Sequence, residues 1–242
     1  MKRSIYIGFD PSEAAAYWVA AASIRRHLST AIPLNSLELT ELQRRGLYTR
    51  PHEQRCGQLH DTISNHPMST EFANSRFLVP HLAKEGWALF IDCDVLIRGA
   101  LVELFDQADE RYAVMCVKHD YQPTSKRKMD GKTQSVYSKK NWSSVMLFNC
   151  NHTANQRLTL QWVNYATGRA LHGFEWLEPY QIGDLDVRWN YLVGHSHCLA
   201  PKIVHWTEGG PWLDEYRWTE YAEEWFAALR LTARYLCPGS LI

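Results

Sequence analysis

The chain has 242 residues, and its 26 basic side chains balance 26 acidic ones, so its formal net charge is zero. This balance argues against a dedicated nucleic-acid binder, whose affinity comes from neutralised phosphates, and against a polybasic membrane module. Ordinary hydrophobic (45%) and charged (21%) fractions exclude a disordered chain, while ten tryptophans suggest a heavy core or a site that stacks on sugars or bases.

In chain order, apolar runs alternate with helical segments. Residues 4–9 are expected to form a first strand, and Asp10, Pro11 and Glu13 then provide a helix start for residues 14–27. The alternation continues with expected strands at 34–39, 87–91, 112–117 and 145–150, helices at 69–82, 155–168 and 219–236, and a loop at 43–68. The pattern predicts a single α/β domain built on a mostly parallel or mixed sheet.

The N-terminal region and the cysteines bear on the compartment. The first apolar run, Ile5–Phe9, is too short for a signal-peptide core or a membrane span. The six cysteines include no C-x-x-C pair, so a zinc site is not expected. Buried free thiols in a reducing compartment are the simplest interpretation, and we expect a cytoplasmic protein with no transmembrane segment.

The most informative stretch is the D-x-D pair Asp92 and Asp94, which directly follows the apolar run 87–91. On an extended chain, residues two apart point to the same side, about 6–7 Å apart, and both carboxylates can reach one hard cation. Without a cation, two like charges at a strand end raise each other's pKa. Since ligands bind at the carboxyl ends of strands in open α/β sheets, the pair predicts a divalent-metal site. A second pair, Asp184 and Asp186, lies in a polar turn and is interpreted as structural.

Two reaction classes use such a pair. In phosphatases like the haloacid dehalogenases, the first aspartate is the nucleophile, a role that would fall to Asp92, although that family opens with this strand and here the strand comes later. In GT-A glycosyltransferases, the pair holds Mn²⁺ or Mg²⁺ on the diphosphate of a nucleotide sugar.

The order of motifs resembles the GT-A glycosyltransferases, in particular glycosyltransferase family 8, from about Ile5 to Trp212. The similar segments are the first strand at 5–10, the arginine-containing helix at 70–80, the metal motif at 90–94, the segment at 101–105, the strand at 142–149, the pair Trp189–Asn190, and the loop at 205–212. The resemblance implies a GT-A-like, Rossmann-type mixed sheet flanked by helices. It also implies a nucleotide- and metal-binding half at 1–117 and a sugar- and acceptor-binding half at 118–242.

The resemblance assigns roles to individual residues. The metal ligands that it implies are Asp92, Asp94 and His205, and two carboxylates with one imidazole suit Mn²⁺, with Mg²⁺ as the alternative. The donor-binding residues that it implies are Ile7, Gly8, Phe9, Asp10, Arg76, Asp92, Ser143, Ser144, Gly210 and Trp212.

Two departures from the family pattern concern donor binding. Trp142 and Ser144 replace the family's Asn and Gly, and Asn141 is a candidate for the sugar contact that this removes. Gly210 stands where the family has a phosphate-binding Lys. A lysine of the basic segment 118–140, or Lys202, is a candidate for the missing charge.

The catalytic residues follow from weaker signals. The family's Asp-Gln pair corresponds here to Tyr180–Gln181, or is displaced to Glu178, so the resemblance implies Gln181 as a catalytic residue and transfer with retention. Asp120 follows a strand end beside His119 and is a candidate for proton transfer or for an acceptor contact.

The function expected from the sequence is metal-dependent transfer of a hexose from a nucleotide sugar, UDP-linked, to a saccharide, lipid or protein acceptor that the sequence does not identify. The alternatives are a phosphatase or phosphotransferase that uses Asp92 covalently, and a non-catalytic module that binds nucleotide sugars. The absence of a lysine at Gly210 would be the mark of the latter.

Overall fold

The computed structural model describes residues 1–120, 127–128, 132–133 and 139–236. Its centre is a six-stranded sheet whose strands are, in order across the sheet, β12 (Ile182–Asp184), β8 (Val114–Cys116), β11 (Val145–Asn149), β6 (Trp87–Ile91), β1 (Arg3–Gly8) and β2 (Leu34–Leu37). The expected mixed α/β fold is therefore confirmed, with the expected strands at or within a few residues of their predicted positions.

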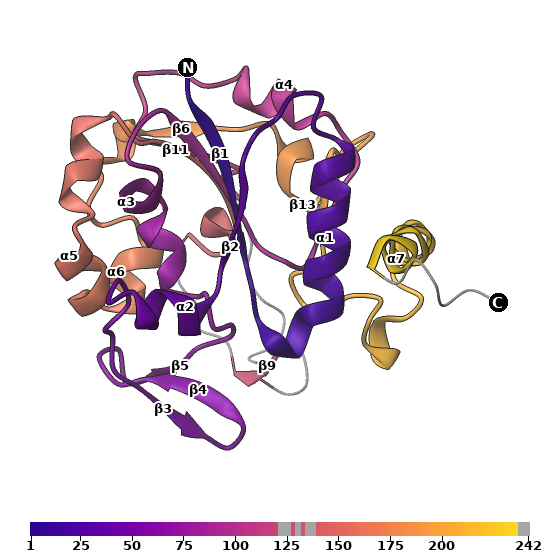
Figure 1. Ribbon diagram of the computed structural model, residues 1–242, viewed down its shortest axis with the longest axis horizontal. Coiled ribbons are helices and arrows are strands. Elements are labelled where there is room, and N and C mark those ends of the chain that lie inside the picture. The colour runs from indigo at the N-terminus through magenta and orange to yellow at the C-terminus, as the bar shows by residue number, and fades with distance from the viewer. Residues whose placement is uncertain (121–126, 129–131, 134–138, 237–242) are drawn as a thin grey trace.

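Strand direction decides which side chains meet. Within the central sheet, β11 runs antiparallel to its neighbours β6 and β8, and the other pairings are parallel. The carboxyl ends of β1, β6, β8 and β12 therefore share one edge, together with the beginning of β11. This edge faces the lower part of Figure 1, where β1 ends and α1 begins. Residues that leave these strands are collected there.

Helices cover both faces of the sheet (Figure 1). On one side lie α1 (Ala14–Arg26) and α7 (Ala222–Leu236), and on the other lie α3 (Val79–Ala83), α5 (Leu160–Tyr165) and α6 (Gly168–His172). The short helices α2 (Leu39–Arg44) and α4 (Leu101–Phe105) belong to connections. β6 and β11 are buried along their whole length, as continuous apolar strands covered on both faces should be.

A smaller sheet adds a second apolar cluster. It consists of β13 (Tyr191–Leu192), β14 (Ile203–His205) and β7 (Val95–Ile97), and the sequence pattern did not predict any of these short strands. Its side chains pack with α1 and α7 in a cluster that includes Val19, Leu96, Val204, Trp206 and Trp225. The last helix is thereby bound to the sheet that carries His205.

Two helices differ from the expected ones, the first because capping residues interrupt it and the second because α3 begins only at Val79. The segment at 155–168 is divided, since the side chains of Thr159 and Thr167 each accept a backbone N–H and begin a new helix, α5 and α6. Gly168 thus opens α6 instead of closing a helix. Pro80 lies in the first turn of α3, where its missing N–H leaves no bond unmade, so it does not end the helix.

The expected loop at 43–68 is also wrong in part. It contains an antiparallel sheet of β3 (His52–Arg55), β4 (Gln58–Asp61) and β5 (His66–Pro67). Polar residues occupy both faces of β3 and hide the alternation that marks a strand. Cys56 and Gly57 both have positive φ (49° and 79°), which suits the tight turn between β3 and β4.

In the basic segment 118–140, β9 (Arg127–Lys128) pairs with β10 (Lys132–Thr133), and the remainder of 121–138 lies outside the described residues.

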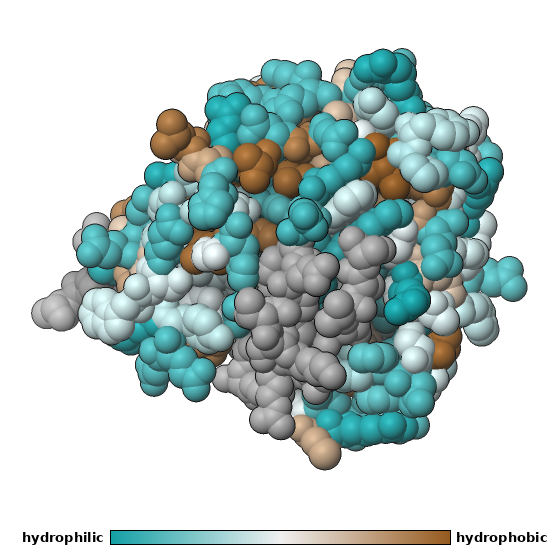
Figure 2. Space-filling view, turned by 180° about the vertical axis from the view of Figure 1, so that it is seen from behind, coloured by the Kyte–Doolittle hydropathy of each residue, from teal (hydrophilic) through white to brown (hydrophobic). Residues whose placement is uncertain are grey.

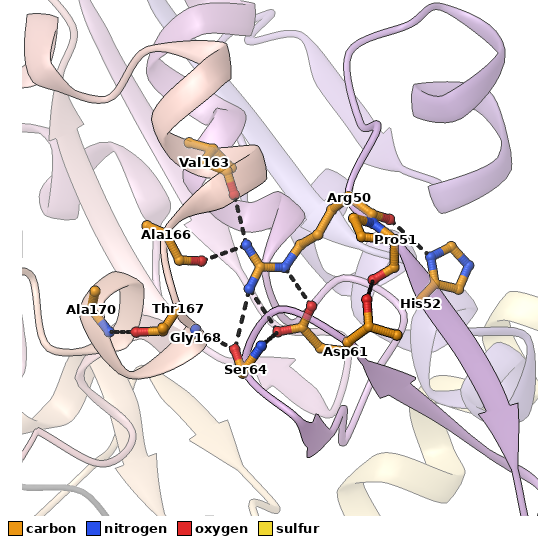
Figure 3. A network of polar contacts seen from close by, with 11 residues as sticks. Arg50, Pro51, His52, Asp61, Ser64, Val163, Ala166, Thr167, Gly168 and Ala170 are labelled. Carbon is orange, nitrogen blue, oxygen red and sulfur yellow. Dashed lines mark hydrogen bonds and ion pairs between the residues drawn. The ribbon is translucent and has the colours of Figure 1, made fainter.

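A buried ion pair attaches this hairpin to the main domain (Figure 3). Arg50 Nη2 lies 2.6 Å from Asp61 Oδ2, and the two side chains are 0% and 3% exposed. The same guanidinium donates through Nη1 to the carbonyl oxygens of Val163 (3.2 Å) and Ala166 (2.5 Å), at the end of α5. Burial alone would raise the pKa of Asp61, but hydrogen bonds from Arg50 and Ser64 outweigh it and lower that pKa.

The surface seen from behind is mainly hydrophilic, with apolar side chains in a band across its upper half (Figure 2). Among the described residues, no helix combines the length and the apolar character that crossing a bilayer requires.

Replacing Arg50 by Met should destabilise the protein by about 3–5 kcal/mol, because Asp61 would be left as a buried charge with its main partner removed. Urea unfolding measures the difference. The matched control is Arg55→Met on the same hairpin, where the pair with Glu53 is about half exposed and its loss should change stability by less than about 1 kcal/mol. Equal effects of the two substitutions would show that the buried pair does not anchor the hairpin.

Candidate active site

Asp92 and Asp94 leave β6 at the shared carboxyl edge of the sheet. The backbone N–H of Asp92 donates to the carbonyl oxygen of Ser144 (2.9 Å), just before β11, so the first carboxylate is fixed where the antiparallel strand begins. Asp94 immediately precedes β7, and its side chain is 5% exposed. The apolar run that ends in two acids thus places both at the site that the sequence predicted.

Arg76 holds the first of these carboxylates. Its Nη1 lies 2.8 Å from Asp92 Oδ1 and also donates to the carbonyl oxygen of Ser143 (2.9 Å). The guanidinium carbon lies 5.2 Å from the ring centroid of Phe72 and 4.9 Å from that of Phe90, which adds cation–π attraction. Because Arg76 is 5% exposed, the ion pair is screened little by solvent.

His205 reaches the pair from a distant part of the sequence. β14 runs antiparallel to β7 with His205 opposite Val95, which brings the imidazole beside Asp94. His205 Nε2 lies 3.2 Å from Asp94 Oδ1, and His205 is 1% exposed. One ligand atom from each of Asp92, Asp94 and His205 lies within 4.8 Å of the others.

The chemistry of this three-residue group fits a divalent cation. Carboxylate oxygens and one imidazole nitrogen are ligands that Mn²⁺ accepts, and Mg²⁺ prefers the oxygens. Two carboxylates so near one another repel unless positive charge lies nearby, and Arg76 supplies one such charge. A divalent cation between the three ligand atoms would supply the rest.

The residues expected to bind the donor lie along the same edge but make different contacts. Ile7 is wholly buried in β1, and Gly8 lets the ring of Phe72 approach, since a β-carbon there would lie 2.4 Å from that ring. Phe9 packs edge-on against Tyr17, with centroids 5.0 Å apart.

Asp10 connects two segments at this edge. One carboxylate oxygen accepts the N–H (2.9 Å) and the hydroxyl (2.7 Å) of Ser12, as the expected helix cap should, and the other accepts the N–H of Glu71 (3.1 Å). Its position beside the end of β1 therefore joins the start of α1 to the segment that leads to Arg76.

Gly210 and Trp212 form a tight contact in the loop after His205. A β-carbon at Gly210 would lie 2.1 Å from the Trp212 ring, so this loop has no room for a lysine at that position. Trp212 itself packs against Trp206 and Trp225. Lys202 pairs with Glu103 at the other end of β14, away from His205, and so does not bring its charge to Asp92, Asp94 and His205.

The two residues expected to be catalytic lie at opposite edges of the sheet. Gln181 precedes β12, and its side-chain oxygen accepts the N–H of Glu178 (2.9 Å) in a capping box. It therefore stands at the amino end of β12, across the sheet from Asp92. Asp120 follows β8 at the carboxyl edge and lines a cavity of about 460 Å³.

This cavity lies at the carboxyl edge, and one of its lining residues, Leu192, is paired with His205 in the small sheet. Its lining includes His119, Asp184 and His195. Burial and then the charge of His205 lower the pKa of His119. Lys118 pairs with Asp184 (3.1 Å) at the rim. Asp184, interpreted from the sequence as part of a structural turn, thus belongs to the cavity, because β12 is parallel to β8 and ends at the same edge.

Sequence reasoning overlooked one buried acid beside the site. Glu13, placed by the sequence only in a helix start, is 3% exposed and accepts the thiol hydrogen of Cys93 (3.2 Å), the residue between Asp92 and Asp94. A buried acid at a helix start carries no signal in the sequence that separates it from an ordinary capping residue.

Solved structures with a similar fold are glycosyltransferases. The bifunctional glycosyltransferase WbbM matches with a TM-score of 0.66 and 15% identity over 97% of this chain, and GlyE of Streptococcus pneumoniae with 0.60 and 14% over 99%. The galactosyltransferase LgtC, solved with donor and acceptor sugar analogues, matches with 0.58 and 15% over 94% of this chain and 95% of its own. The chain spans half the length of WbbM and 65% of GlyE. The fold is the GT-A fold of glycosyltransferases, and membership of family 8 stays a prediction.

At the level of sequence, the chain is 43% identical to Protein CDI of Arabidopsis thaliana over 228 residues, which are 91% of this chain and 83% of that protein. The chain belongs to the same family as Protein CDI. No protein-family model matches it.

His119 should make stability fall in acid. Burial, followed by the charge of His205, lowers its pKa from 6.5 to about 3, so the unfolded state binds a proton that the folded state excludes. Stability should therefore fall as the pH drops below about 6.5, by up to about 2 kcal/mol at pH 5.

Urea unfolding at pH 7 and pH 5 measures this contribution. The loss between these values should be smaller in His119→Gln than in the wild type. The control is His81→Gln, at an exposed position, which should keep the full loss. An unchanged loss in His119→Gln would show that His119 does not resist protonation.

Proposed function

We propose that the protein is a metal-dependent glycosyltransferase that moves a hexose from a UDP-linked sugar to an acceptor hydroxyl. The observation that carries the proposal is the convergence of Asp92, Asp94 and His205 at the carboxyl edge of a GT-A fold. The likeness to glycosyltransferases favours this function over a phosphatase that would use Asp92 as a nucleophile.

The proposed division of labour follows the contacts. Asp92, Asp94 and His205 would hold Mn²⁺ or Mg²⁺, which when bound neutralises charge on the diphosphate as the glycosidic bond breaks. Arg76 keeps the Asp92 carboxylate in position through their 2.8 Å ion pair. In the reaction, the bond from the sugar C1 to the diphosphate breaks, a bond from C1 to the acceptor oxygen forms, and the acceptor proton leaves with the nucleoside diphosphate.

The rest of the donor-binding set is proposed from its place at the same edge. Ile7, Gly8, Phe9 and Asp10 end or follow β1, whereas Ser143 and Ser144 precede β11. Nucleotide contacts would come from the first group and sugar contacts from the second. Gly210 and Trp212 shape the loop after His205 without providing a charge.

The acceptor is proposed to enter the 460 Å³ cavity beside His119. Carboxylates of Asp120 and Asp184 and the ring of His195 line it, and such groups accept hydrogen bonds from hydroxyls. Lys118 at its rim already pairs with Asp184. The lining therefore supports a hydroxyl-rich acceptor such as a saccharide.

Several finer points rest on the resemblance or on composition. Transfer with retention and a catalytic role for Gln181 stay predictions, as does the division of a single domain into halves at residue 117. The described cysteines Cys56, Cys93, Cys116, Cys150 and Cys198 are free thiols, which supports a reducing compartment, and we propose the cytoplasm.

A thermal-shift panel of nucleotides tests donor binding. With Mn²⁺ present, UDP or a UDP-sugar at about 100 times its Kd should stabilise the wild type by about 2.7 kcal/mol, raising Tm by several degrees, and EDTA should abolish the shift. Asp94→Asn should lose the shift, because it removes a ligand charge without changing the shape of the side chain. The control Asp214→Asn, at a fully exposed position, should keep it.

The same panel discriminates the alternatives. A melting temperature that no nucleotide raises would contradict the proposal. Nucleotide binding without slow, Mn²⁺-dependent hydrolysis of any sugar nucleotide would favour the non-catalytic binding module, the function that the absence of a lysine at Gly210 favours.

A further inference from the structure

Asn190 contacts His205 from the side opposite the acids. It ends the short helical segment Val187–Asn190, and the next residue enters β13, which lies parallel to β14 with Leu192 opposite His205. Asn190 is 0% exposed, and its Oδ1 lies 2.9 Å from His205 Nδ1. Its side chain is therefore shielded from water and in direct contact with an expected metal ligand.

The orientation of the Asn190 amide is settled by its other partners. Its Nδ2 lies 2.9 Å from Ser144 Oγ and 3.3 Å from the carbonyl oxygen of Asn141. The Ser144 hydroxyl donates its hydrogen to that same carbonyl oxygen (2.6 Å). It can therefore only accept a hydrogen bond from Asn190. Two acceptors must face the NH₂ group, which leaves the amide oxygen towards His205.

This orientation determines which nitrogen of His205 carries hydrogen. An amide oxygen only accepts hydrogen bonds, so Nδ1 of His205 must be the donor. In a neutral imidazole the lone pair then lies on Nε2, which is 3.2 Å from Asp94 Oδ1. A lone pair and a carboxylate oxygen at that distance repel each other unless a proton or a cation lies between them.

We propose that Asn190 is a positioning residue that fixes His205 in the Nδ1–H tautomer and aims its Nε2 lone pair at the Asp92–Asp94 pair. The inference rests on the proposed function only in taking a divalent cation as the occupant of that group. Outer-shell partners of this kind are worth about 10–100-fold in metal affinity.

The network around Asn190 gives the arrangement rigidity. Asn141 has the left-handed backbone conformation (φ 65°) that turns its carbonyl towards Asn190 and Ser144. Thr207, two residues beyond His205, donates its hydroxyl hydrogen to the Asn141 side-chain oxygen (3.0 Å). The end of β14 is thus attached twice to the turn that precedes β11, through Asn190 at His205 and directly at Thr207.

Mn²⁺ alone is the probe for the first test, with free Mn²⁺ measured by electron paramagnetic resonance. Asn190→Leu should raise the Kd for Mn²⁺ about 10–100-fold. The matched control is Asn155→Leu. Asn155 is also buried, donates to two oxygens (Ala113 and Asn149, both 2.8 Å) and accepts from the ring N–H of Trp176 (3.1 Å), but it lies at the opposite edge of the sheet.

Asn155→Leu should lower stability and leave the Kd for Mn²⁺ within about twofold, because it removes a similar set of bonds without touching His205. An Asn190→Leu protein that binds Mn²⁺ as tightly as the wild type would overturn the inference. So would equal losses of affinity in both variants, since these would show a structural role only.

A second measurement needs no variant. The ring-nitrogen NMR shifts of His205 in the wild type with Mg²⁺, a diamagnetic ion, should show hydrogen on Nδ1 and none on Nε2. Hydrogen on Nε2 alone would overturn the inference. If the wild type binds neither ion, the metal-dependent function fails, while the ring shifts of the metal-free protein still identify the tautomer that Asn190 imposes.

Discussion

The structure of the candidate active site depends on how negative charge is tolerated at the carboxyl edge of the central sheet. Asp92 and Asp94 follow a strand that is buried along its whole length, where water can do little to stabilise them. Arg76 offsets part of this charge from within the core, beside two phenylalanine rings. The remaining negative charge would favour a divalent cation at this edge. Every other element at the site can be understood as placing groups around these two acids.

The topology explains why groups far apart in the sequence can do this together. Parallel strands deliver the residues after β1, β6, β8 and β12 to one edge, and the small sheet adds His205 through the pairing of β14 with β7. Asp92 and Asp94 are accordingly joined by His205, which lies more than a hundred residues further along the chain. Trp225 of α7 packs in the same apolar cluster as Trp212 and Trp206, the neighbour of His205, so three of the ten tryptophans help to hold this part of the chain in place.

How far the sequence predicts this arrangement depends on whether the residues involved are close together along the chain. The D-x-D pair was found because an apolar run and two acids are local, and the helix cap at Asp10 for the same reason. His205 needed a resemblance, since its approach to Asp94 depends on strand pairing over more than a hundred residues. Asn190 received no role from the sequence beyond its place in a similar segment, because nothing local ties it to His205. The sequence did not predict the caps at Thr159 and Thr167, because threonine is also common in strands and loops. Only the folded backbone shows which N–H donates to each hydroxyl.

The antiparallel direction of β11 constrains the length of this strand. Because it runs against its neighbours, its first residues, rather than its last, reach the edge where Asp92 emerges, and the carbonyl oxygen of Ser144 receives the Asp92 amide there. The length of β11, five residues, therefore fixes the distance between the turn at Asn141 and the opposite edge of the sheet. A single insertion or deletion within it would turn the side chains on one side of the change to the opposite face, or else would displace Ser144 and Asn141 from Asp92 and His205. The contacts that build the site thus leave little freedom in the length of β11 in this chain.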